Sequence, residues 1–111
     1  MSDIIIYRKD SYQIQFTIWE DKEAGIPLDI TGKTFYMTVN RDKNPTNTDN
    51  QIFSITGTIS DPINGVVYFT PSSIETTQTA GTYYYDIVMV TASNPRTLVK
   101  AKFNILQGIK Q

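Results

Sequence analysis

The side chains that most often carry catalysis are missing from this sequence. Its 111 residues include neither histidine nor cysteine, which removes the usual general base near neutral pH, a thiolate zinc site and any disulfide framework. Carboxylates remain as candidates. Glu20, Asp21 and Glu23 could act as an acid–base set, but they share one charged turn ending at Gly25, with no apolar segment to build a pocket around them. We therefore expect a solvated turn and no enzyme.

A second group of acidic residues could offer oxygen ligands to calcium. Asp42, Asp49 and Asp61 have several asparagines among them, and carboxylate and amide oxygens suit a hard cation. Their spacing matches no known calcium loop, however. Residues 42–50 form the most polar window of the chain and lack a hydrophobic anchor. The sequence therefore predicts an exposed loop, without a metal or another cofactor.

The elements that would position any site are β-strands. Apolar and polar residues alternate with a period of two in several windows, as expected for half-buried strands, and Asn64-Gly65 is typical of a hairpin turn. Ser72 and Glu75 could cap a single helical turn. The predicted strands cover residues 4–8, 12–19, 33–41, 51–60, 66–70, 80–90 and 96–105.

This pattern predicts an all-β fold and one domain over residues 1–111. Seven strands with frequent turns favour an immunoglobulin-like antiparallel β-sandwich with one short helical turn, while a small barrel remains the alternative. The segment 26–32 should be a loop in which Leu28 and Ile30 plug one end of the sandwich. Lys100 and Lys102, on one face of the last strand, should protect an edge from unwanted pairing.

Three consecutive tyrosines open the strand at residues 80–90. Immunoglobulin-type domains place a tyrosine at the corner before a late strand, two residues ahead of a core position. Here Tyr83 has the corner spacing after Gly81, and Tyr85 occupies the core position where those domains often have cysteine. A buried phenol needs a hydrogen-bond partner, which a backbone carbonyl in the preceding crossover could supply. The alternation leaves Tyr84 facing outward.

Three aromatic residues are candidates for contact with a partner: Trp19, Tyr36 and Tyr84. Each lies on the polar face of its predicted strand, and large exposed aromatics often anchor interfaces. For Trp19 the alternative is that it covers the edge of the core where the strand ends. A different function for all three would be stacking against the sugar rings of a glycan.

Charge and hydropathy exclude two classes of partner. The formal net charge is −1, and the ten basic residues are dispersed along the chain, so no nucleic-acid footprint is predicted. The longest apolar runs, such as residues 4–7, are far too short to cross a bilayer, and no signal-type segment opens the chain. We expect synthesis in the cytoplasm and no membrane partner.

The order of the turn motifs resembles one known family, the immunoglobulin-like N-terminal domain of phage baseplate upper proteins and related tail or head fibre proteins. The similarity extends over residues 9–106. The similarity rests on six motifs. They are the strand 9–18, which begins with polar residues, the Pro-Leu-Asp-Ile-Thr-Gly segment 27–32, the turn 61–67 with its Asp, Gly and Val, the Gly-x-Tyr-x-Tyr-Asp-Ile segment 81–87, Thr97-Leu98, and Phe103 to Ile105.

The resemblance implies a structural protein of the bacteriophage virion that docks onto other phage structural proteins and could form homo-oligomers. In the family, this module usually begins a longer chain that makes fibres or receptor-binding parts. The present sequence ends at Gln111, so the expected role is an adaptor or a small accessory protein of the tail, baseplate or head.

Overall fold

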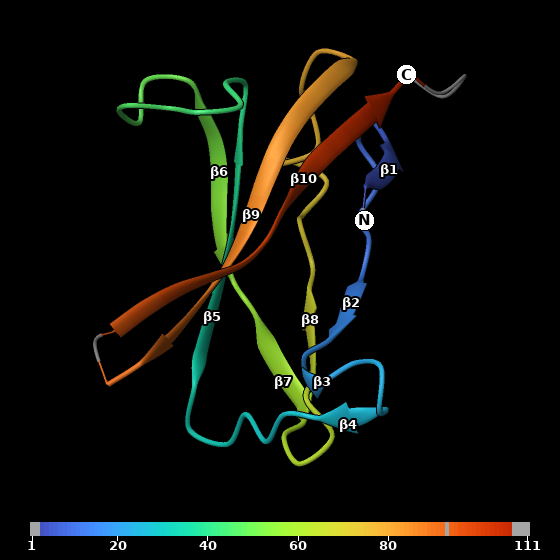
Figure 1. Cartoon of the computed structure of the whole chain (residues 1–111). Coiled ribbons are helices and arrows are strands. Elements are labelled where there is room, and N and C mark those ends of the chain that lie inside the picture. Colours follow the sequence, from blue (N-terminus) through green and yellow to red (C-terminus); the bar gives the residue numbers. More distant parts are fainter. Residues whose placement is uncertain (1–2, 93, 108–111) are drawn as a thin grey trace.

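The computed structural model describes residues 3–92 and 94–107, which form ten strands in three sheets (Figure 1). The larger sheet has the order β1-β10-β9-β5-β6, the second has the order β2-β8-β7, and β3 pairs with β4. The strands are β1 Ile4–Tyr7, β2 Ile14–Thr17, β3 Trp19–Asp21, β4 Ile26–Pro27, β5 Thr34–Asn40, β6 Gln51–Thr56, β7 Thr58–Asp61, β8 Val66–Phe69, β9 Gly81–Thr91 and β10 Asn94–Leu106.

The core lies between the five-stranded and three-stranded sheets, on the inward face that the alternation predicts. On β5, Phe35, Met37 and Val39 are buried while Tyr36 between them is exposed. The same alternation continues along β9. Ile30 is also fully buried and Leu28 packs against the core, which confirms that the segment between β4 and β5 closes one end of the sandwich.

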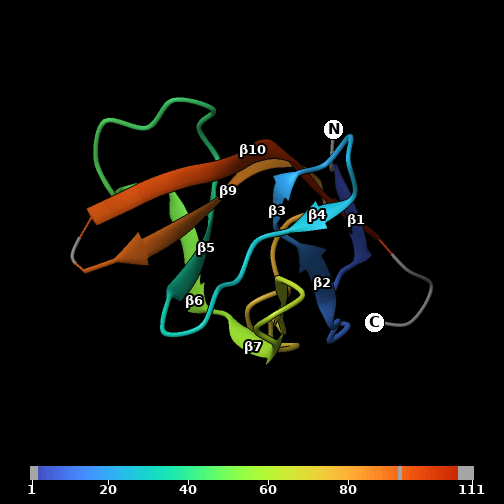
Figure 2. The ribbon, with the colours of Figure 1, turned by 60° about the horizontal axis from the view of Figure 1, so that its bottom comes forward.

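The strand pairing is that of an immunoglobulin-like sandwich, as predicted. Strands β2, β8 and β7 pair as B, E and D do in that fold, and β5, β9 and β10 pair as C, F and G, with β6 added beside β5. One pair departs from the antiparallel expectation: β1 runs parallel to β10, with Ile4 opposite Phe103 and Tyr7 opposite Leu106. Figure 2 shows β10 crossing the molecule, with only its C-terminal end beside β1.

Two predicted strands are each divided because the chain passes from one sheet to another. The window 51–60 becomes β6 and β7, which lie in different sheets and meet at Gly57. There the Gly57 amide donates to the Phe35 carbonyl over 2.8 Å, and a Cβ atom would lie 2.7 Å from the Phe69 ring. The window 12–19 likewise becomes β2 and β3, separated by the buried Ile18. The expected loop 26–32 also contributes the short β4.

The crossover before β9 contains a capped turn instead of a helix. The Ser72 amide donates to the Glu75 carboxylate over 2.8 Å, and the Glu75 amide donates to the Ser72 hydroxyl over 3.2 Å, so the capping box forms. One bond of α-helical spacing follows, from Thr76 N to Ser72 O, and one of 3₁₀ spacing, from Thr77 N to Ile74 O. No α- or 3₁₀-helix occurs within the described residues. The buried Thr76 hydroxyl donates to the Asp10 carbonyl and fastens the crossover to the β1–β2 connection.

Candidate functional site

The tyrosines of β9 divide between the core and the outer surface. The Tyr83 hydroxyl donates to the Thr79 carbonyl over 2.5 Å, and only 5% of Tyr83 is exposed. Tyr85 packs between the rings of Phe16 and Phe103, and burial raises the pKa of its phenol to about 12. Gly81 is the first residue of β9 and pairs with Ile105. This is the geometry that a corner tyrosine requires, and its stabilising role stays a prediction.

The structure separates the three aromatic residues that were candidates for partner contact. Trp19 is 39% exposed on β3, beside a hollow lined by Ile4, Ile14 and Phe16 between β1 and β2. Tyr36 is 40% exposed on β5, and Tyr84 is half-buried on β9. Tyr36 and Tyr84 share the outer face of the large sheet, but Tyr84 lies opposite Asn40 in the register. No single surface therefore unites the three.

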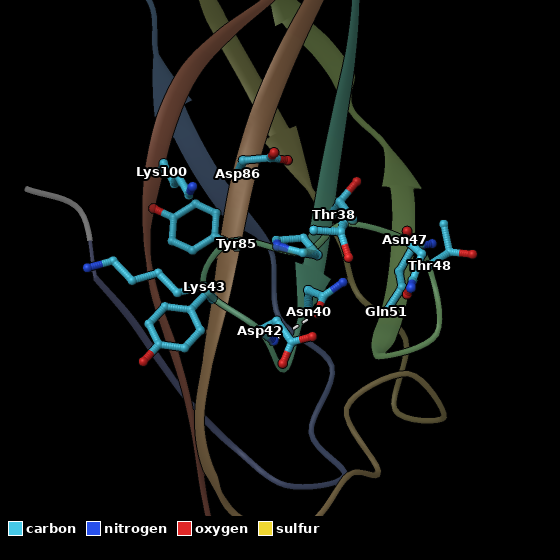
Figure 3. A pocket seen from close by; sticks show the side chains of 13 residues that line it. Thr38, Asn40, Asp42, Lys43, Asn47, Thr48, Gln51, Tyr85, Asp86 and Lys100 are labelled. Atoms are coloured by element: carbon cyan, nitrogen blue, oxygen red, sulfur yellow. Dashed lines mark hydrogen bonds between the residues drawn. The ribbon is translucent and has the colours of Figure 1, made fainter.

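A hollow of about 340 Å³ lies over the outer face of β5 and β9, beneath the loop that joins β5 to β6 (Figure 3). Its floor is formed by Thr38, Asn40, Tyr84 and Asp86, and its walls by loop residues 42–48 and Lys100. Most of these side chains are polar, and the lining also includes Pro45 and the two tyrosines Tyr84 and Tyr85. Sequence reasoning singled out Tyr84 but missed Asp86, although the two-residue spacing on a strand places both on the same face.

The loop over the hollow is held by its own hydrogen bonds. The buried Asn40 side chain accepts from the Asp42 amide over 2.8 Å, and the Asn50 side chain donates to the Asp42 carboxylate over 2.9 Å. From the far side, Lys100 on β10 donates to the Asn44 side chain over 2.7 Å. The polar loop expected at residues 42–50 is exposed throughout, and these bonds hold it against the sheet.

Asp86 is the half-buried carboxylate of this hollow. Among the described residues, its Oδ1 atom is buried and has no hydrogen-bond partner. Burial raises the pKa of the Asp86 carboxyl, while the charge of Lys100 lowers it. In the register, Thr38 and Lys100 lie directly opposite Asp86 on its two neighbouring strands. A buried acceptor without a donor is uncommon in native structures and needs an explanation.

A second hollow, of about 210 Å³, lies on the other side of Tyr84. It is lined by Asp3, Ala101 and Lys102, and it shares Lys43, Tyr84 and Lys100 with the first. The Tyr84 ring therefore lies between two neighbouring depressions. Lys100 and Lys102 were expected to protect an edge; here both face these depressions, because β1 covers only the last four residues of β10.

The outer face of the large sheet carries an apolar patch at β1 and the end of β10. Ile5 and Tyr7 are 64% and 47% exposed, and Leu106, which pairs with Tyr7, is 41% exposed. Strand β1 is the last strand of its sheet, so one of its backbone edges has no strand partner among the described residues. Sequence reasoning missed this patch because nothing in Ile4-Ile5-Ile6-Tyr7 tells which strand would lie beside it.

The carboxylates considered for metal binding are far apart. Asp42 and Asp49 belong to the loop between β5 and β6, whereas Asp61 lies in the β7–β8 hairpin at the opposite end of the sandwich (Figure 1). In residues 3–92 and 94–107, no group of three or more His, Cys, Asp or Glu side chains could hold a metal ion. The same residues include no helix long and apolar enough to span a membrane.

Fold and surface together define an immunoglobulin-like β-sandwich with two hollows and an apolar patch on the outer face of its large sheet. The family model described as the BppU N-terminal domain, that of the baseplate upper protein, matches residues 2–108. The chain belongs to this family of phage baseplate domains, which confirms the expected resemblance. Membership implies a component of the virion that interacts with other phage structural proteins. A comparison with curated proteins found no match.

Proposed function

We propose that this protein is a non-enzymatic docking module that joins other structural proteins of the virion through the free edge of β1. The family membership supports a baseplate role. The observation that favours this surface is the group Ile5, Tyr7 and Leu106, whose side chains are all more than 40% exposed on the outer face of the large sheet, beside the free edge of β1. Docking needs no catalytic group, in keeping with a sequence that lacks histidine and cysteine.

The chemistry of β1 suits strand addition. Exposed edges are usually protected by lysine, proline or a bulge, but the four residues of β1 are Ile, Ile, Ile and Tyr. A partner strand laid along this edge would gain backbone hydrogen bonds and would cover the apolar side chains of Ile5 and Tyr7. Asp3, Arg8 and Lys9 flank the strand and would limit the register of pairing. Two copies of the chain could pair in the same way around a symmetry axis.

Incorporation into virions tests the proposal. A phage lacking the gene would be complemented with the wild-type protein, with Ile5→Lys or with Ile63→Lys, and the protein content of purified particles would be measured by mass spectrometry. Ile63 is the matched control because it is 70% exposed in the β7–β8 hairpin, away from β1. We expect Ile5→Lys to lower incorporation about tenfold or more, because a buried lysine without a partner opposes docking.

Two results would contradict this assignment. Wild-type protein absent from the particles would reject the virion role itself. Normal incorporation of Ile5→Lys, with an unfolding temperature equal to that of the wild type, would show that docking uses another surface. Light scattering of the purified wild-type protein, compared with Ile5→Lys, would show whether the same edge also joins two copies.

A further inference from the structure

The two hollows beside Tyr84 have the chemistry of a sugar site. The half-buried ring of Tyr84 offers an apolar face, while the amide of Asn40, the carboxylate of Asp86 and the ammonium group of Lys100 surround it. A pyranose needs this combination, because its ring has an apolar face of C–H groups and its rim carries hydroxyls that both donate and accept hydrogen bonds. Figure 3 shows the side chains of Asn40, Asp86 and Lys100, which arise from β5, β9 and β10.

Asp86 is the group that a merely structural role does not explain. Farther along the same outer face, β9 carries Val88 and Val90, so the position does not require a polar residue. The Oδ1 atom nevertheless lies buried without a donor among the described residues. An acceptor in this state lowers stability unless a ligand or water donates to it. A ligand hydroxyl in the hollow would donate to the Asp86 carboxylate and offset part of this cost.

Charge decides between a sugar and an ion. The first hollow is lined by two carboxylates, Asp42 and Asp86, and by two lysines, Lys43 and Lys100. These charges balance, so neither a phosphate-like anion nor a cation would gain a net attraction. A neutral ligand with many hydroxyls can satisfy both signs at once. The volume of about 340 Å³ is near the lower end of the roughly 300–1,000 Å³ typical of small-molecule sites.

We propose that this surface binds a neutral saccharide, with one pyranose stacked on Tyr84 and donating a hydroxyl to Asp86. The second hollow continues past Tyr84 toward Asp3 and Lys102, so a disaccharide or longer chain would lie across the ring. Lys100 and the Asn40 amide would donate to the sugar oxygens. The site adjoins the start of β1 through Asp3, but Ile5, Tyr7 and Leu106 line neither hollow, so sugar binding does not require docking at that edge.

Titration with sugars tests the site directly. Methyl glycosides of common neutral hexoses and N-acetylhexosamines would be added to the ¹⁵N-labelled protein up to tens of millimolar, and amide shifts would be followed by NMR. A glycan array in parallel would separate free sugars from polysaccharide ligands. We expect at least one neutral glycoside to shift the amides around Tyr84 and Asp86, with tighter binding of the matching disaccharide. Tyr84→Ala and Asp86→Asn should each weaken binding about tenfold or more.

The controls distinguish loss of the site from loss of the fold. Tyr84→Phe keeps the ring and should retain binding, and Tyr36→Ala removes a tyrosine of the same sheet face that does not line either hollow. Lys100→Ala offers a second, exposed position in the site. The proposal is overturned if no neutral sugar binds in either format, or if Tyr84→Ala, Asp86→Asn and Lys100→Ala all bind as the wild type does. Normal incorporation into virions alongside either outcome would leave the docking proposal unaffected.

Discussion

Gly65 offers the most direct test of how this sandwich is held together. It follows the Asp61–Asn64 turn, in which the Asp61 carboxylate accepts from both the backbone and the side chain of Asn64. Its φ is +70°, and its own carbonyl accepts from the Ile18 amide over 2.8 Å. The backbone at the β2–β3 junction therefore passes directly over this glycine.

The substitution Gly65→Ala combines two penalties. An alanine at this φ costs about 1–2 kcal/mol. Its Cβ would also press against the Ile18 carbonyl oxygen and lie 2.8 Å from that of Leu28. Both obstacles are backbone atoms and cannot rotate away, so overpacking adds about 1–3 kcal/mol. We expect a total loss of about 2–5 kcal/mol in the free energy of unfolding.

Gly25→Ala is the matched control. Gly25 has nearly the same φ, +71°, but nothing lies within 4 Å of its added Cβ. It should show the conformational penalty alone, about 1–2 kcal/mol. Urea unfolding followed by circular dichroism measures both variants. If Gly65→Ala loses no more stability than Gly25→Ala, the backbone around Ile18 and Leu28 moves aside at little cost in free energy, and the packing argument is wrong.

Four further predictions concern β9 and Lys100 on the neighbouring β10. Tyr83→Phe should lower the free energy of unfolding by about 1 kcal/mol, because water can reach the Thr79 carbonyl that loses its donor in the exposed crossover. Tyr36→Phe, the control, should leave the stability unchanged. Equal effects of the two substitutions in thermal or urea unfolding would reject the corner role of Tyr83. Burial raises the pKa of Asp86 in the folded protein. The stability that this shift contributes is therefore present at pH values below the ordinary carboxyl pKa, and it is lost as pH rises through the pKa of the folded state. Asp86→Asn should therefore remove the fall in stability that accompanies rising pH between the ordinary carboxyl pKa and the raised one. Lys100→Met should move the Asp86 carboxyl titration, followed by NMR, to higher pH, because the charge of Lys100 lowers that pKa. An unchanged profile or an unchanged titration would refute the corresponding prediction. The Tyr85 pKa of about 12 predicts a phenol whose tyrosinate absorbance develops well above the ordinary tyrosine range. Stability should fall between the ordinary tyrosine pKa and that pH.

Much of the fold follows from local sequence signals. Strict alternation in β5 and β9 determines which side chains face the core, as Phe35, Met37 and Tyr85 show by their burial. The turn chemistry of Asn64-Gly65 and the capping pair Ser72 and Glu75 were equally readable, because each is satisfied by atoms a few residues away. Local periodicity reports faces and turns accurately.

The sheet changes could not be read in this way. Alternation continues unbroken from β6 into β7, so the chain shows no loss of period where it leaves one sheet for the other. The signal was Gly57, whose lack of a side chain allows close packing against Phe69, but a glycine in a strand has several explanations. The parallel pairing of β1 with β10 depends on residues about a hundred positions apart.

The candidate site shows the same division between local and distant signals. Alternation along the strand predicted that Tyr84 faces outward. Its half-buried state was not predictable, because it depends on side chains from other strands. The hollow itself exists because the loop between β5 and β6 folds back to reach Lys100, a contact that spans 56 positions along the chain. Trp19, which composition alone made prominent, lies on a different sheet from Tyr36 and Tyr84.

The parallel pairing of β1 with β10 also has a mechanical consequence. The chain enters the sandwich at the start of β1 and leaves it at the end of β10, and the two strands point the same way across four residue pairs. Tension between the two ends would slide one strand along the other and load all the hydrogen bonds between them together. An antiparallel pair pulled in this way would open one bond at a time. The first and last strands thus form a clamp in shear, suited to a domain that transmits force between its neighbours.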